Sequence, residues 1–144
     1  MKKQNTQVYS YDCSVYPTKL DIMFDINNID YMNDNYAWES DPECKFVFDD
    51  DDQYGSTYDL LYNKKTKYKT ILVVFDGIPS PPQMAHEAFH VMNGIFKSVD
   101  LEFNYSKTTG NEHLAYIIEW AVKCMCDAVE KEKKCKKQNS KTSK

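Results

Sequence analysis

Two histidines one helical turn apart, with a glutamate directly after the first, are the residues of this chain best suited to chemistry: His86, Glu87 and His90. Residues i and i+4 lie on the same face of an α-helix, so both imidazoles can reach one cation while Glu87 projects beside it. Zinc binds imidazole nitrogen, and a neighbouring carboxylate can take a proton from water activated there. The motif therefore predicts a catalytic zinc site with Glu87 as general base.

A catalytic zinc ion takes three protein ligands and leaves one position for water. Glu112 is the candidate for the third ligand, since a helix that begins near it can aim its first turn at the metal. His113 competes for this role, because adjacent helical residues point about 100° apart and only one can face the ion. Tyr116 is a second catalytic candidate, since its hydroxyl could stabilise an oxyanion or orient a metal ligand, and the second of these roles is favoured. Glu119 and Asp100 are candidates to orient the histidines through hydrogen bonds to their outer nitrogens.

The sequence around the metal motif contains signals for the start and the end of one helix. Ser80 is the predicted N-cap, Pro81 takes the first helical position, and Gln83 can bond back to the cap. Gly94 is a typical C-terminal stop. We therefore expect a helix from about Pro81 to Asn93 that contains the whole motif.

A second helix is expected to begin in the segment 109–112. Its apolar stripe comprises Leu114, Ile117, Ile118, Ala121, Val122, Met125 and Val129. From Lys133 onward the chain is rich in charge and poor in apolar residues, which is typical of disorder. The sequence thus predicts one domain over residues 1–132 and a disordered, lysine-rich tail over residues 133–144.

Several segments have the composition of strands. Alternation predicts a half-buried strand over residues 20–26, and a β-branched run predicts a fully buried one over residues 68–75, antiparallel to the strand before it. Two more strands are expected over residues 44–48 and 56–62, and a short helix over residues 29–38. The predicted fold is α+β, with an antiparallel or mixed sheet packed on the motif helix and a long C-terminal helix. The 68–75 strand would bind an extended peptide if it lies at an edge.

Composition excludes several classes of protein. The 144 residues carry a net charge of -4, which gives no general attraction to nucleic acid or anionic membrane. No nucleic-acid partner is expected except weakly through the lysine-rich tail, whose composition favours a solubilising, disordered end. No apolar run is long enough to cross a bilayer. Five cysteines without a C-x-x-C pair argue against a disulfide framework and a cysteine-ligated zinc, so free thiols are expected. The acidic run over residues 49–52 lacks the spacing of a calcium loop and is expected to be solvated.

Three segments together resemble a family of small phage-encoded, predicted zinc metallopeptidases: Val15-Tyr16-Pro17-Thr18-Lys19-Leu20, His86-Glu87-Ala88-Phe89-His90 and Gly110-Asn111-Glu112-His113-Leu114-Ala115-Tyr116. The resemblance implies a zincin-like fold, zinc as cofactor and a peptide or protein as substrate. It also implies that the Glu of the segment ending in Ala-Tyr, here Glu112, is the third ligand. The expected location is the cytoplasm of the host cell, or the virion.

Two functions remain open at this point. The first is a working zinc peptidase. The second is a virion component, such as a tail ring, collar or adaptor, which keeps a zincin fold with or without its metal and can contact other phage structural proteins. Glu87 favours the peptidase, because it is not a metal ligand and would be dispensable at a purely structural zinc site.

Overall fold

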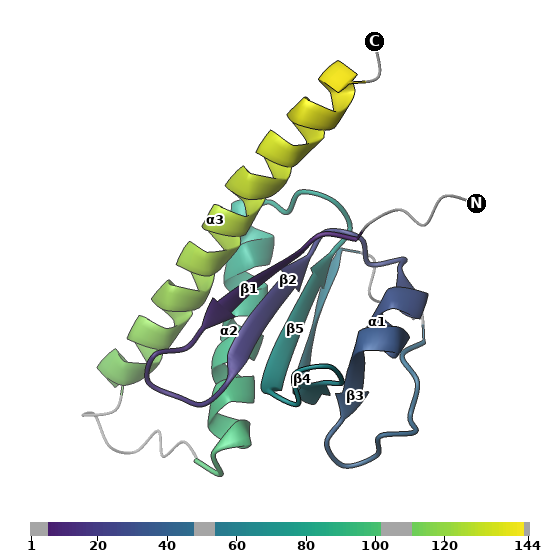
Figure 1. Cartoon of the computed structure of the whole chain (residues 1–144). Coiled ribbons are helices and arrows are strands. Elements are labelled where there is room, and N and C mark those ends of the chain that lie inside the picture. Colours follow the sequence, from purple (N-terminus) through teal and green to yellow (C-terminus); the bar gives the residue numbers. More distant parts are fainter. Residues whose placement is uncertain (1–5, 48–53, 102–110, 143–144) are drawn as a thin grey trace.

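The computed structural model describes residues 6–47, 54–101 and 111–142, which form one sheet with helices on both of its faces (Figure 1). The strands are β1 (Val8–Asp12), β2 (Lys19–Met23), β3 (Tyr36–Trp38), β4 (Gly55–Asn63) and β5 (Lys69–Phe75). The helices are α1 (Ile29–Asn35), α2 (Pro81–Ser98) and α3 (Asn111–Thr142). The predicted α+β class, with a mixed sheet and a long C-terminal helix, is confirmed.

The five-stranded sheet has the order β1-β2-β5-β4-β3, in which only the β2–β5 pair is parallel. β5 is buried and antiparallel to β4, as predicted. However, β5 pairs with a strand on each side, so it is not an edge strand and cannot bind an extended peptide through its backbone. Among the described strands, β3 pairs with β4 through Leu61, Tyr62 and Asn63. The beginning of β4 therefore has β5 as its strand partner within the described residues, and it lies next to α2.

Three short elements differ from the sequence prediction. The segment expected to be a helix over residues 29–38 divides into α1 and β3, because Tyr36–Trp38 pairs with β4, far away in the sequence. Residues 44–47 of the expected 44–48 strand are not in a strand. β1, which was not predicted, adds an antiparallel partner to β2. Whether a segment becomes a strand depends on pairing with segments far away in the sequence, and local composition does not encode that pairing.

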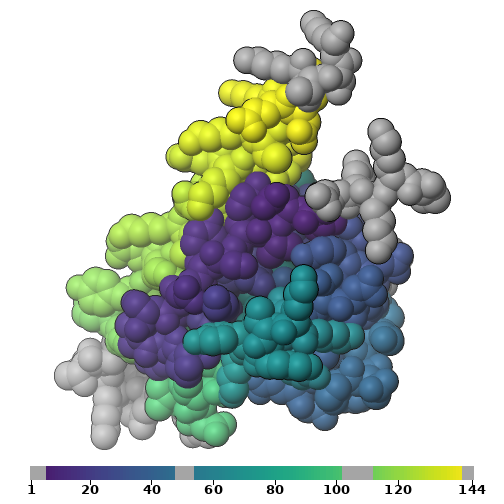
Figure 2. Space-filling model, viewed as in Figure 1, coloured from purple at the N-terminus to yellow at the C-terminus, as the bar shows by residue number. Residues whose placement is uncertain are grey.

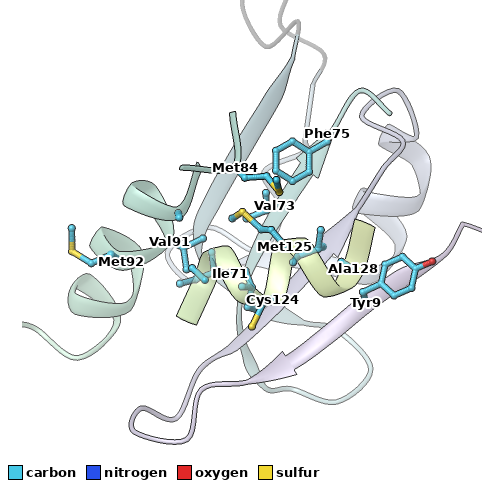
Figure 3. Packing of buried hydrophobic residues seen from close by; sticks show 14 of the residues in the cluster. Tyr9, Ile71, Val73, Phe75, Met84, Val91, Met92, Cys124, Met125 and Ala128 are labelled. Carbon is cyan, nitrogen blue, oxygen red and sulfur yellow. The ribbon is translucent and has the colours of Figure 1, made fainter. Parts of the chain in front are cut away.

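Each face of the sheet has its own apolar core. α2 and α3 cover one face, where Leu20 and Ile22 of β2 point, and α1 covers the other, where Met23 points. Figure 3 shows Met84 of α2 and Met125 of α3 directed toward the β5 side chains between them. Burying one such side chain stabilises the fold by about 1.5–3 kcal/mol. This packing holds α2 and its motif at a fixed height above β4 and β5.

The start of α2 is as predicted, but its end is not. The backbone N–H of Ser80 donates to Gln83 Oε1 at 2.7 Å, which closes the capping box. The helix then continues through Gly94 to Ser98. A Cβ atom at Gly94 would lie 2.8 Å from Asp59 Cβ and 3.1 Å from Ile71 Cδ1. Gly94 therefore permits close packing of α2 on the sheet, and its interpretation as a stop signal was wrong.

α3 begins at Asn111 and extends for 32 residues. Its inner face is the predicted stripe, with Ile117, Ala121, Met125 and Val129 buried. The helix continues to Thr142, where the sequence had predicted a disordered tail. Lysine is a good helix former, and i,i+4 pairs such as Lys136–Glu132 add support to this segment. In the part of the chain that the structure describes, no helix has the length and apolarity needed to cross a membrane.

Candidate metal centre

The two histidines of the motif lie together on the surface of α2. His86 Nε2 and His90 Nε2 are 3.2 Å apart, and both side chains are exposed. Two nitrogens bound to one tetrahedral zinc ion at about 2.05 Å would be about 3.3 Å apart. The 3.2 Å separation is that of a hydrogen bond between the two rings, and it is also close to this value, so the pair has the spacing of two ligands of one ion.

Glu87 follows His86 and points about 100° away from it around the helix, toward the sheet. Only 6% of its surface is exposed. The Thr57 hydroxyl of β4 donates a hydrogen bond of 2.6 Å to Glu87 Oε2. Sequence reasoning missed Thr57, because a single polar residue in a strand gives no signal of what it faces. The bond fixes the orientation of the Glu87 carboxylate relative to the sheet.

An open cavity of about 390 Å³ lies where the start of α2 meets the start of β4. Its lining residues are Tyr54, Gly55, Pro82, Gln83, His86 and Glu87. The cavity therefore brings one imidazole of the pair and the buried carboxylate to the same solvent-accessible space. Gly55 is required at this position, since a Cβ there would lie 2.9 Å from Phe75 Cδ1.

The predicted third ligand lies elsewhere. The first turn of α3 packs beside the end of α2, where the His113 ring contacts Phe96 with a centroid distance of 5.8 Å. Phe96 is six residues beyond His90, which corresponds to about 9 Å along the helix axis. Glu112, exposed and adjacent to His113, is therefore not brought to the histidine pair. Within residues 6–47, 54–101 and 111–142, no group of three or more His, Cys, Asp or Glu side chains is arranged to hold a metal ion.

His113, the alternative third ligand, is engaged in an aromatic cluster. Its Nε2 lies 2.6 Å from the Tyr16 hydroxyl, and its ring packs between Tyr16 and Phe96. The segment containing Tyr16, which carries part of the family resemblance, thus meets the segment containing His113 in space. This contact stabilises the start of α3 and does not bring His113 to the other two histidines.

The remaining site candidates also lie away from Glu87. Tyr116 is 64% exposed and borders a separate, mainly apolar cavity of about 270 Å³ together with Cys13, Val15 and His113. Glu119 forms an ion pair of 2.5 Å with Lys123. Asp100 follows the end of α2, ten residues beyond His90, and its N–H donates to the Lys97 carbonyl. The described structure therefore brings together His86, Glu87 and His90 from the predicted set.

All five cysteines are free thiols, where the sequence had predicted that most of them would be. Burial in the core between α3 and the sheet raises the pKa of the Cys124 thiol to about 11, so this residue is an inert apolar side chain at neutral pH. The acidic run over residues 49–52 lies outside the described residues, and its expected solvation stays a prediction.

Comparison of the chain with protein-family models, with curated proteins and with solved structures finds no match. The resemblance to small phage peptidases therefore stays a prediction, and the function must be inferred from the chain's own residues.

Proposed function

We propose that this chain is a zinc-dependent peptidase in which His86 and His90 bind the metal and Glu87 is the general base. The observation that carries the proposal is the 3.2 Å separation of the two Nε2 atoms beside a buried glutamate that lines the same cavity as His86. Two nitrogens at that separation suit a tetrahedral ion, and the neighbouring carboxylate suits proton transfer at a hydrolytic centre.

A zinc ion held by the two imidazoles would polarise a peptide carbonyl and lower the pKa of water in the site. Glu87 takes a proton from the attacking water, whose oxygen forms a bond to the carbonyl carbon. As the C–N bond breaks, Glu87 passes that proton to the leaving amine nitrogen. Thr57 holds one carboxylate oxygen throughout, so the base does not need to reorient during the reaction. No covalent enzyme intermediate is needed.

The proposed peptide position is along the beginning of β4, near Gly55. This part of the sheet lies beside α2 and opens into the cavity that Glu87 lines. An extended chain there can bind through backbone hydrogen bonds, as in strand addition. The beginning of β4 replaces the strand over residues 68–75 as the proposed substrate-binding strand.

The described structure does not bring Glu112 to the histidine pair, so a role as third ligand would require the first turn of α3 to approach the ion, and substitution tests that role. If Glu112 does bind the ion, Glu112→Ala should weaken zinc binding by at least about tenfold, since even outer-shell partners of a metal contribute 10–100-fold. Glu119→Ala, seven residues later on the exposed surface of α3, is the matched control and should leave the affinity unchanged. Equal affinity of the two variants would remove Glu112 from the site and leave the two histidines as its protein ligands.

A second candidate function rests on the same hydrogen bond. Glu87 and Thr57 join α2 to β4 inside the fold, and a buried bond of this kind can serve structure alone. Such a role for Glu87 is compatible with the alternative left open by the sequence, a virion component such as a tail ring, collar or adaptor, which needs no turnover. In that case Glu87 would be retained for packing.

Glu87→Gln separates the two functions. We expect the purified protein to bind close to one equivalent of zinc by elemental analysis, and the variant to keep that zinc. Hydrolysis of a fluorogenic peptide library should fall by about 10²–10⁴-fold, the usual contribution of a general base. Glu119→Gln, an exposed glutamate of α3, is the control for the charge change.

Two results would contradict this proposal. Wild-type protein that takes up less than about half an equivalent of zinc, even with zinc added, would exclude the metal site. Zinc uptake with no hydrolysis of any library peptide would favour the structural alternative.

A further inference from the structure

The charges of this chain are separated along its length. Residues 131–144 contain seven lysines and one glutamate, which gives a net charge of +6. Because the whole chain has a net charge of -4, the other 130 residues carry a net charge of -10. We propose that the end of α3 from residue 131, here called the lysine end, binds the phosphate backbone of a nucleic acid. This activity is independent of the proposed peptidase site.

The lysine end stands out from the acidic body. No described side chain from residue 130 to residue 140 is buried, and Figures 1 and 2 show this part of α3 extending past the sheet. From Val129 to Ser140 the helix advances by about 16 Å. The inner side of the lysine end, at Lys136 and Asn139, borders a cavity together with Asp25 of the body. A polyanion on the outward side lies farther from the body, and the screening length at physiological ionic strength is about 8 Å.

Three lysines are available for phosphate contacts on one face of the helix. Lys131 and Lys136 form ion pairs with Asp127 and Glu132. Lys133, Lys134 and Lys137 are exposed, and no ion pair is found for them in the described part of the chain. Helical geometry places these three within about 100° of one another, on the side opposite the buried stripe. They form a positive ridge directed to solvent.

The side chains around this ridge favour phosphate over other partners. From residue 130 to residue 140 the only apolar side chain is Cys135, so the segment lacks the large apolar face that inserts into a membrane. It also lacks the aromatic and arginine anchors of protein interfaces. The chain has no arginine, the residue most often used to read guanine. Binding to a phosphodiester backbone needs only lysine charges, and would be independent of base sequence.

The test measures binding of a short fluorescein-labelled DNA duplex of mixed sequence by fluorescence polarisation, over about 20–150 mM KCl. With three to five phosphate contacts, a plot of log affinity against log salt should have a slope of about -3 to -4.5. The triple substitution Lys133→Gln, Lys134→Gln and Lys137→Gln should lower the magnitude of that slope by about 2.7 and weaken binding at low salt by at least tenfold. Glutamine keeps helix propensity, so the fold of α3 is preserved.

The matched control removes three exposed lysines elsewhere: Lys45→Gln, Lys65→Gln and Lys123→Gln. It has the same net charge as the test variant and should keep the wild-type slope. Equal losses in the two triple variants would show an unlocalised charge effect and overturn the proposal, as would no DNA binding at the lowest salt. Binding to phosphatidylserine vesicles without DNA binding would assign the lysine end to membranes instead. Salt-sensitive dimers without DNA binding would assign it to a second copy of the chain.

Discussion

Glu87 and Asp21 are buried carboxylates on opposite faces of the same sheet. They are almost equally exposed, 6% and 5%, and each accepts a hydrogen bond from a hydroxyl, at 2.6 Å from Thr57 and at 2.8 Å from Tyr36. Glu87 lines a cavity and follows a histidine whose partner lies one turn away. Asp21 lies within β2 under Tyr36, on the face that α1 covers.

The difference between the two carboxylates shows that burial alone does not distinguish a catalytic acid from a structural one. A buried acid with a hydroxyl partner is compatible with either packing or chemistry. At Glu87 a reacting molecule has a cavity to enter and a pair of imidazole nitrogens lies nearby, whereas the described contacts of Asp21 include neither of these. Solvent access and neighbouring ligands therefore distinguish a catalytic candidate from a structural acid.

The largest expected effect concerns the proposed zinc site, which distinguishes Glu87 from Asp21. His90→Ala should weaken zinc binding by more than about 100-fold, because losing a ligand costs more than losing an outer-shell partner. Isothermal titration with zinc measures the change.

The matched control for this prediction is His113→Ala, which removes an imidazole held by Tyr16 and Phe96. It should keep the zinc affinity of wild type while lowering the free energy of unfolding by about 1–2 kcal/mol. If His113→Ala lost zinc as His90→Ala does, the metal would involve the start of α3 and the site would need to be redrawn.

The next effect tests the packing that holds Glu87 against Thr57. Gly94→Ala would normally stabilise a helix by about 1 kcal/mol. Here the added Cβ would lie 2.8 Å from Asp59 Cβ, and overpacking of this kind costs about 1–3 kcal/mol. We therefore expect a net loss of stability in urea denaturation, while Asn93→Ala, one residue earlier, should change it by less than about 0.5 kcal/mol. A gain in stability at Gly94 would mean that α2 does not approach β4 this closely.

The features that sequence predicted correctly depend on neighbours along the chain. The i,i+4 spacing of His86 and His90 places both imidazoles on one helical face, whatever the rest of the fold does. The capping box at Ser80 and Gln83 and the apolar stripe of α3 are equally local. These periodic signals were sufficient to place the histidine pair on a helix and to assign the α+β class.

The features that sequence missed depend on residues far apart in the chain. Thr57 lies 30 residues before Glu87, and only the pairing of β4 with β5 beneath α2 brings the two together. A glycine at position 94 is typical of a helix end, but here it is needed because α2 packs closely against Asp59 and Ile71. The position of Glu112 depends on how α3 packs against α2, which no local pattern specifies.

A smaller effect is expected when the hydroxyl that donates to each carboxylate is removed, Thr57 for Glu87 and Tyr36 for Asp21. Thr57→Val should lower stability by less than about 1 kcal/mol, because the cavity beside Glu87 lets water replace the lost donor. Tyr36→Phe should cost about 1–3 kcal/mol, because Asp21 loses a donor inside the core. Thermal unfolding at neutral pH measures both. Equal losses would show that Glu87 is as enclosed as Asp21, which would weaken its candidacy as a general base.

The smallest effect is the pH dependence contributed by Asp21. Burial raises the pKa of Asp21 above its usual 3.8, against the opposing effects of its hydrogen bonds and of Lys19. The folded state therefore holds this proton more tightly than the unfolded state does. That contribution to stability is complete below about pH 3.8 and is lost as pH rises through the folded-state pKa. Asp21→Asn, which stays neutral, does not lose it.

The free energy of unfolding of wild type and of Asp21→Asn is measured in urea from acid to neutral pH. The difference between the two proteins isolates the contribution of Asp21 from that of the other titrating acids. Asp21→Asn should become more stable relative to wild type as pH rises from about 3.8 through the folded-state pKa, and the difference should then become constant. The sign of this change follows from the raised pKa of Asp21, which burial causes. A difference that stayed constant with pH, or that favoured Asp at neutral pH, would mean that the Asp21 carboxylate is as well stabilised in the fold as in water. Asp21 would then not serve as the example of a purely structural buried acid with which Glu87 is compared.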